Sequence, residues 1–107
     1  MADFSFDERR SGEAAELALA GDLDMRATFR LEPALDRLLE DDSVSEVVLD
    51  LGGVEFVDSS GLGLLLNAYD RSRDADVALS IRPGSESTQR VFRLAGVEDA
   101  LPFTDGE

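Results

Sequence analysis

Near the N-terminus, apolar and polar residues alternate with a period of two, which predicts β-strands. Phe4 and Phe6 indicate a short first strand with one buried face. A second strand has an apolar face formed by Ala15, Leu17 and Leu19. The polar stretch Glu8 to Glu13 between them contains a glycine and is expected to turn, so the two strands should form a hairpin. Gly21-Asp22-Leu23-Asp24 is expected to end the second strand.

From Thr28 the period changes to that of an amphipathic helix. The apolar stripe of this helix consists of Leu31, Ala34, Leu35, Leu38 and Leu39. Pro33 fits the first turn of such a helix, or else it kinks a helix that begins earlier, and both alternatives stay open. The polar run from Glu40 to Ser43 should end the helix.

An almost continuous apolar run, Glu46 to Leu51, comes next. Such a run is typical of a parallel strand covered on both faces, so it predicts the central strand of a sheet. Gly52-Gly53 is expected to break the strand, and Val54 to Val57 continue the chain to Asp58. A helix should follow Asp58, with an apolar stripe formed by Leu62, Leu65, Leu66 and Tyr69.

The C-terminal third predicts a further strand, a helix and one short edge strand. The strand alternates at Val77, Leu79 and Ile81. After the Pro83-Gly84 turn, Ser85 should cap a helix that Gly96 ends, with apolar positions at Val91, Phe92, Leu94 and Ala95. The short edge strand is expected at Leu101-Pro102-Phe103. The order β-β-α-β-α-β-α-β predicts one α/β domain over residues 1–107, with a mixed sheet and helices packed against it.

Composition and charge narrow the range of partners. A hydrophobic content of 43% over 107 residues is that of a globular domain. The 24 acidic and 10 basic residues give a net charge of −14. A field of this sign repels phosphates and anionic lipids, so we expect neither nucleic acid nor membrane as partner, and basic protein surfaces are favoured instead.

Several residue types are absent, and this excludes most enzyme mechanisms. The chain has no Cys and no His, and all ten basic residues are Arg. It therefore lacks the usual zinc ligands, a thiol nucleophile, an imidazole base and a phosphate-binding lysine. Asp24, Asp50 and Asp58 are better interpreted as solvated or docking carboxylates than as a magnesium or acid–base cluster. We expect no enzyme, no metal and no cofactor, and the lack of a signal peptide predicts a cytoplasmic protein.

The segment Asp58-Ser59-Ser60-Gly61-Leu62-Gly63 is the candidate site. It follows a buried strand and opens a helix, so its hydroxyls lie at the positive end of the helix dipole, where free N–H groups would stabilise a phosphate. The absence of side chains at Gly61 and Gly63 would let another protein approach the backbone. The simpler alternative is that Asp58 or Ser59 is only an N-cap and that the glycines fit a crowded turn.

The surrounding residues resemble a known family. Val48 to Leu51 followed by Val54 to Gly63 resembles the core signature of STAS domains, and more narrowly that of bacterial anti-sigma factor antagonists. Leu19 to Asp24 resembles a second motif of that group, and Val91 to Val97 resembles its later helix with a glycine end. The resemblance covers about residues 4 to 103.

The resemblance implies a partner-switching protein. Unphosphorylated members bind an anti-sigma factor that is also a serine kinase, and thereby free a sigma factor. Phosphorylation releases the antagonist, and a serine phosphatase removes the phosphate. By this resemblance Ser59 is the acceptor, and the docking surface comprises Asp22, Asp24, Asp58, Ser60, Gly61, Leu62 and Gly63. Family members often carry a further C-terminal helix, whereas this sequence stops at Glu107, so what that helix covers should be exposed or covered differently.

Two other functions compete with this interpretation. The first is a STAS scaffold subunit of a stress-signalling or lipid-transport complex. Members of those groups often have extra domains or lack the acceptor serine, so the intact Asp58-Ser59-Ser60 favours the antagonist. The second is an autonomous nucleotide-binding or nucleotide-hydrolysing protein, which ranks last because no phosphate-loop lysine is present.

Overall fold

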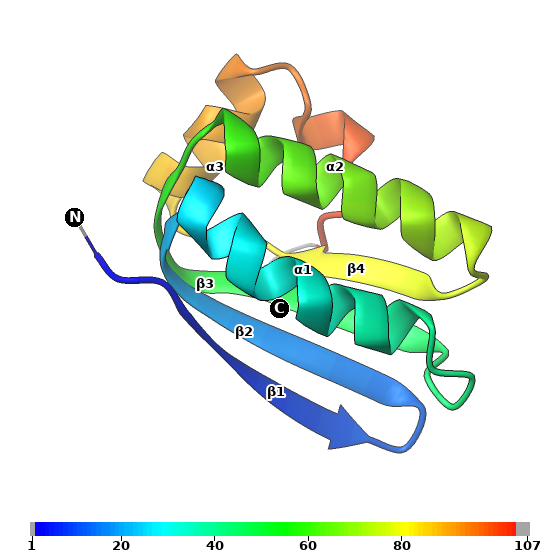
Figure 1. The fold of residues 1–107 in the computed structure, drawn as a ribbon. Coiled ribbons are helices and arrows are strands. Elements are labelled where there is room, and N and C mark those ends of the chain that lie inside the picture. The colour runs from blue at the N-terminus through cyan, green and yellow to red at the C-terminus, as the bar shows by residue number, and fades with distance from the viewer. Residues whose placement is uncertain (1, 105–107) are drawn as a thin grey trace.

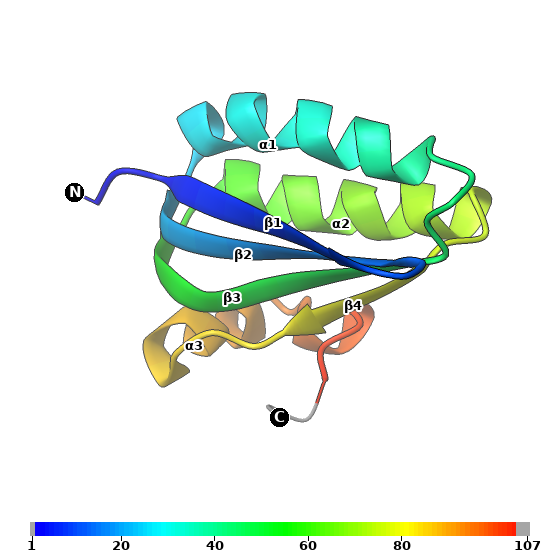
Figure 2. The same cartoon turned by 90° about the horizontal axis from the view of Figure 1, so that it is seen from below.

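Four strands form a single mixed sheet with helices on both of its faces (Figures 1 and 2). The computed structural model describes residues 2–104. The elements in chain order are β1 (Ser5–Ser11), β2 (Ala14–Leu23), α1 (Met25–Leu39), β3 (Glu46–Val57), α2 (Ser59–Asp74), β4 (Ala78–Arg82), α3 (Glu86–Leu94) and a 3₁₀ turn, η1 (Glu98–Ala100). The strand order is β1-β2-β3-β4, with β1 antiparallel to β2 and the other pairs parallel. This confirms the predicted α/β fold with the 46–51 strand in the interior of the sheet.

The N-terminal hairpin is longer than its sequence predicts. β1 continues to Ser11, so the expected turn over Glu8 to Glu13 is wrong, and the chain reverses at Gly12 and Glu13. Gly12 adopts a positive φ of 62° there. β1 is an edge strand whose residues are exposed apart from the half-buried Phe6. A polar sequence is compatible with such a strand, because its backbone pairs with β2 without burying its side chains.

Helix α1 begins earlier than its apolar stripe suggests, at Met25, with Asp24 as N-cap. Pro33 therefore lies inside the helix, which decides between the two alternatives left open by the sequence. Proline has no N–H to donate to the carbonyl of Phe29 one turn before it. Pro33 itself is exposed, so no buried packing is disturbed by its ring.

Gly52-Gly53 does not break the third strand, contrary to expectation. β3 runs through both glycines, and its pairing with β2 shifts register twice, between Ala18 and Ala20 and between Gly21 and Asp22, with the extra residue on β3 each time. A Cβ at Gly53 would lie 3.0 Å from the Ala20 Cβ and 3.0 Å from the Leu19 carbonyl oxygen. Glycine therefore allows β2 and β3 to stay close where their register changes.

The helix stripes and the last strand also need correction. The buried positions of α2 are Gly61, Leu64, Leu65, Ala68 and Ser72. Leu62, Leu66 and Tyr69 lie at the margin of the core and are only partly buried. On α3, Phe92 is fully buried but Leu94 is 77% exposed. The expected C-terminal edge strand is reduced to a single parallel bridge between Ile81 and Phe103.

The packing brings all three helix N-termini to one edge of the sheet. α1 and α2 lie side by side on one face of the sheet, and α3 lies on the other (Figure 2). On the α3 side, the Phe92 ring meets the Phe103 ring edge-on, with 5.0 Å between the centroids. Each of the parallel strands β2, β3 and β4 leads directly into a helix. Because the carboxyl ends of parallel strands meet at the same edge, the β2–α1, β3–α2 and β4–α3 junctions gather there, which is where open α/β sheets generally bind ligands.

Candidate docking and modification site

Two aspartates begin the neighbouring helices at this edge. Leu23 and Val57 are paired across β2 and β3, so the residues that follow the paired positions, Asp24 and Asp58, come at corresponding ends of adjacent strands. The Asp58 N–H donates to the carbonyl of Leu23 at 3.3 Å. Each aspartate is the N-cap of the helix that follows it. The first turns of α1 and α2 are thereby held next to each other.

Ser59 is the first residue of α2 and is exposed, whereas Ser60 is half-buried. The Asp58 carboxylate accepts hydrogen bonds from the N–H groups of Ser60 at 2.9 Å and of Gly61 at 3.1 Å. The N-cap interpretation is therefore right for Asp58. These two donors are not free, contrary to expectation, so a phosphate on Ser59 would project into solvent beside a carboxylate that already occupies them.

The two glycines of the segment have different surroundings. A Cβ at Gly61 would lie 2.3 Å from the Leu23 carbonyl oxygen and 3.1 Å from Cγ1 of Val57. The lack of a side chain at Gly61 therefore lets α2 pack closely on the end of β2. Because Gly61 is buried, its backbone is not accessible to a partner protein. Gly63, by contrast, is exposed, and a Cβ added to it would have no atom within 4 Å.

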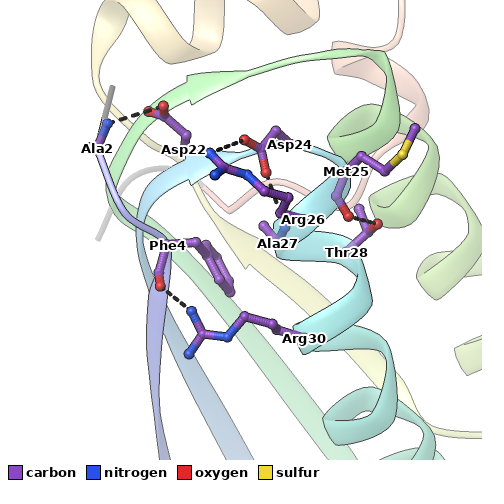
Figure 3. A network of polar contacts seen from close by, with 9 residues as sticks. All are labelled: Ala2, Phe4, Asp22, Asp24, Met25, Arg26, Ala27, Thr28 and Arg30. Carbon is purple, nitrogen blue, oxygen red and sulfur yellow. Dashed lines mark hydrogen bonds and ion pairs between the residues drawn. The ribbon is translucent and has the colours of Figure 1, made fainter.

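Asp22 ties the N-terminal segment to the sheet (Figure 3). Its carboxylate accepts a hydrogen bond from the Ala2 N–H at 3.2 Å, and its own N–H donates to the Ala2 carbonyl at 3.1 Å. Asp22 is only 8% exposed. In the second turn of α1, the Arg30 guanidinium donates a hydrogen bond to the Phe4 carbonyl at 2.5 Å and lies over the Phe4 ring. The position of Asp22 thus supports the fold of the edge and offers little surface to another protein.

Asp24 is nearer the surface. Its carboxylate accepts a hydrogen bond from the Ala27 N–H at 3.0 Å and pairs with Arg26 at 3.5 Å (Figure 3). The hydrogen bond from Ala27 lowers the pKa of Asp24, burial opposes this in part, and the Arg26 charge adds to the lowering. Asp24 is therefore charged at neutral pH and stabilises the N-terminus of α1.

A groove runs between the first halves of α1 and α2. Its volume is about 290 Å³, and it is lined by Thr28, Glu32, Ser60, Gly63, Leu64 and Asn67. Ser60 and Gly63 of the candidate segment thus lie in the groove, while Leu62 packs against the margin of the core. We call this feature the α1–α2 groove.

Sequence reasoning missed two exposed apolar side chains beside the segment. Met25 is 58% exposed and Phe29 is 72% exposed, both on the first half of α1. The signal was an apolar pair at helical spacing, i and i+4, before the first recognised position of the stripe. The change of period at Thr28 predicts a helix that begins there, which leaves Met25 outside the helix and separates it from Phe29.

Metal-ligating side chains do not gather anywhere in residues 2–104, where no group of three or more of them occurs. No helix in that range has the length and apolar content needed to cross a membrane.

Comparison with known proteins identifies the family. A family model described as "Mlab, STAS domain" matches residues 6–103. The chain belongs to the STAS domain family. The anti-sigma-B factor antagonist of Staphylococcus aureus (strain NCTC 8325 / PS 47) is 28% identical over 91 residues, which is 85% of this chain and 83% of that protein. The anti-sigma F factor antagonist of Paenibacillus polymyxa is 25% identical over 89 residues, which is 83% of this chain and 76% of the relative.

Solved structures agree with this fold. Unphosphorylated SpoIIAA, an anti-sigma factor antagonist, superposes with a TM-score of 0.78 at 20% identity, covering 94% of this STAS chain and 86% of its own. An anti-sigma factor antagonist from Mycobacterium paratuberculosis superposes with a TM-score of 0.77 at 24% identity, covering 96% of this chain and 86% of that protein. The relatives are named for antagonising another protein, a binding role, which supports the expectation that this chain is not an enzyme.

Proposed function

We propose that this STAS domain is an anti-sigma factor antagonist that is switched off by phosphorylation of Ser59. In its unmodified form it binds an anti-sigma factor with serine kinase activity and so frees a sigma factor. The kinase transfers the γ-phosphoryl group of ATP to the Ser59 oxygen, releasing ADP and the hydroxyl proton, and a serine phosphatase reverses the modification. The proposed role is cytoplasmic, because bacterial transcription takes place there.

The observation that carries the proposal is the position of Ser59. It is an exposed hydroxyl at the first residue of α2, at the edge where three helices begin. Its neighbours Ser60 and Gly63 line the α1–α2 groove, so a protein that contacts Ser59 has an open backbone position beside it. Of the residues expected to dock, Asp58 and Ser60 are half-buried beside Ser59, while Gly61 and Asp22 are buried.

The relatives support a phosphorylation switch of this kind. SpoIIAA of Bacillus has also been solved in its phosphorylated form, and that structure superposes on this chain with a TM-score of 0.73 at 20% identity. A fold that persists in both states is what a switch acting on docking, and not on folding, requires. An exposed acceptor at a helix start meets the same requirement, since the phosphate needs no space inside the core.

The proposal is tested with the anti-sigma factor that the wild-type chain retains from native lysate, identified by mass spectrometry and then purified as a recombinant protein. Incubation with ATP and magnesium should add one phosphoryl group to wild-type protein and to the Ser60→Ala variant. Ser59→Ala should bind the factor and remain unmodified. Phosphate on Ser60 or Thr88, with Ser59 free of it, would contradict the assignment.

The second candidate is a STAS subunit of a stress-signalling or lipid-transport complex. It is retained because the matching family model is described as "Mlab, STAS domain" and does not name antagonists. This alternative is favoured if the chain co-purifies with a stable assembly that contains no anti-sigma factor and if no kinase modifies Ser59.

A further inference from the structure

We propose that Met25 and Phe29 form an apolar anchor that seats the anti-sigma factor on α1, next to the α1–α2 groove. This inference rests on the proposed function and deepens it. It adds a docking element on a helix outside the modified segment, and it assigns the partner's complementary surface a definite chemistry.

Exposure of large apolar side chains is concentrated at the edge that carries Ser59. Among residues 2–104, four such side chains are exposed, namely Met25, Phe29, Phe56 and Leu94. Met25 and Phe29 start α1, and Phe56 precedes the last residue of β3. Three of the four thus lie where the helices begin, and only Leu94, at the end of α3, lies elsewhere. Clusters of exposed apolar side chains at one place are typical of interaction sites.

Met25 is directed toward α2. In Figure 3 the Met25 side chain points from the first turn of α1 toward the neighbouring helix α2. The Thr28 hydroxyl donates to the Met25 carbonyl at 2.7 Å, and Thr28 itself lines the α1–α2 groove. Asp36, farther along the same side of α1, pairs with Arg71 of α2 at 2.5 Å. Met25 therefore lies beside the groove wall formed by Thr28, and Phe29 follows it one helical turn along α1.

Gly63 gives independent support for occupation of this groove. Glycine inside a helix costs about 1 kcal/mol relative to alanine. At Gly63 the fold gains nothing in return, because a methyl group would meet no atom within 4 Å. The missing side chain keeps the α1–α2 groove open, and a partner side chain placed next to the anchor would fill it.

The charges around the anchor indicate a protein with a basic rim as the occupant. Glu32 lines the groove and is exposed without an ion pair in the described part of the chain, and Asp58 binds only backbone N–H groups. The whole chain carries a net charge of −14. An anionic lipid surface would be repelled by this charge, and so would a second copy of the chain. The complementary surface is an apolar pocket flanked by Lys or Arg side chains on a protein.

The experiment uses the purified anti-sigma factor described above and two matched pairs of variants. Met25→Ala/Phe29→Ala removes the anchor, and Leu94→Ala removes an equally exposed apolar side chain elsewhere. Glu32→Arg reverses a charge at the groove, and Glu46→Arg reverses an exposed one at the opposite end of β3. All five positions are exposed, so thermal unfolding should confirm that each variant folds.

The anchor variant should bind the factor at least tenfold more weakly than wild type, and Glu32→Arg should bind more weakly than Glu46→Arg. Wild-type affinity in the anchor variant would overturn the anchor while leaving the proposed function intact. If no anti-sigma factor binds wild type, the proposed function fails and the anchor with it. Binding of wild type, but not the anchor variant, to anionic vesicles or to itself in sedimentation would also overturn the assignment to a protein partner.

Discussion

At the scale of single residues, Gly61 and Gly63 make a matched pair of substitutions within one helix. Gly61→Ala should destabilise the domain by about 1–3 kcal/mol or more, because the new methyl group would lie 2.3 Å from the Leu23 carbonyl oxygen. Gly63→Ala should stabilise it by up to about 1 kcal/mol, since the methyl group meets nothing and alanine favours helix. Urea unfolding of both variants checks the opposite signs.

Binding provides the second measurement on the same pair. Gly63→Ala narrows the α1–α2 groove, so the more stable variant should bind the anti-sigma factor more weakly. Equal or tighter binding by Gly63→Ala would show that the groove stays empty in the complex.

Asp24 gives a prediction for pH. The hydrogen bond from Ala27 lowers the pKa of Asp24 in the folded state, so its contribution to stability is present above the unfolded-state pKa. This contribution is lost as the pH falls through the lower, folded-state pKa. Asp24→Asn should therefore be less stable than wild type at neutral pH, and the difference should shrink in acid. The free energy of unfolding, measured as a function of pH, checks this, and a difference that grows in acid would have the wrong sign.

The roles of two expected site residues depend on contacts that are distant in sequence. Asp22 binds the backbone of Ala2, and Gly61 packs against the carbonyl of Leu23. A linear motif indicates that a carboxylate and a glycine are present, but it does not reveal which backbone approaches them. Asp58 and Ser59 were predictable as a cap and a helix start because capping is local.

At the scale of elements, Pro33 gives a direct prediction. It lies inside α1, is exposed, and leaves the Phe29 carbonyl without its helical donor. Pro33→Ala restores the N–H and should raise the free energy of unfolding by up to about 3 kcal/mol. Chemical denaturation of the variant and wild type measures the gain. A loss of stability would mean that Pro33 stabilises the protein by reducing the conformational entropy of the unfolded chain, and that this gain exceeds the cost of the missing helical hydrogen bond.

Element prediction succeeded where one face is buried and failed where the structure depends on a distant partner. The alternation in β2 and the apolar run of β3 identify both strands, and Ser85 and Gly96 mark the ends of the α3 region as expected. The first strand and its hairpin were predicted, but the polar second half of β1 is a strand only because β2 pairs with it. Gly52-Gly53 continues β3 because β3 bulges there and stays paired with β2 on both sides of the register shift. Neither the extension of β1 nor the bulge in β3 is visible in the local period.

At the scale of the whole molecule, the charge of −14 and the single phosphate of Ser59 should affect different steps of binding. The overall charge attracts a basic partner over distances of about a Debye length, so association should slow as salt is added. A phosphoserine adds about −1.5 to −2 charges. This is a small fraction of the existing field, so phosphorylation should leave the association rate and its salt dependence nearly unchanged.

The dissociation rate should carry the switch. In the docked complex the phosphate would lie beside the Asp58 carboxylate, whose oxygens already use the N–H groups of Ser60 and Gly61. It would therefore be desolvated without new donors from its own helix, next to a partner seated on Met25 and Phe29. A hundredfold weaker affinity corresponds to about 2.7 kcal/mol, within reach of one uncompensated buried charge.

Association and dissociation rates of the purified anti-sigma factor with the unmodified and the phosphorylated protein, measured at two salt concentrations, test whether the phosphate acts on dissociation and the overall charge on association. Thermal unfolding serves as the control, since Ser59 is exposed and phosphorylation should leave the domain folded. A switch expressed mainly in slower association would mean that the phosphate acts through the long-range field, and a large fall in Tm would mean that it acts by unfolding the edge where the three helices begin.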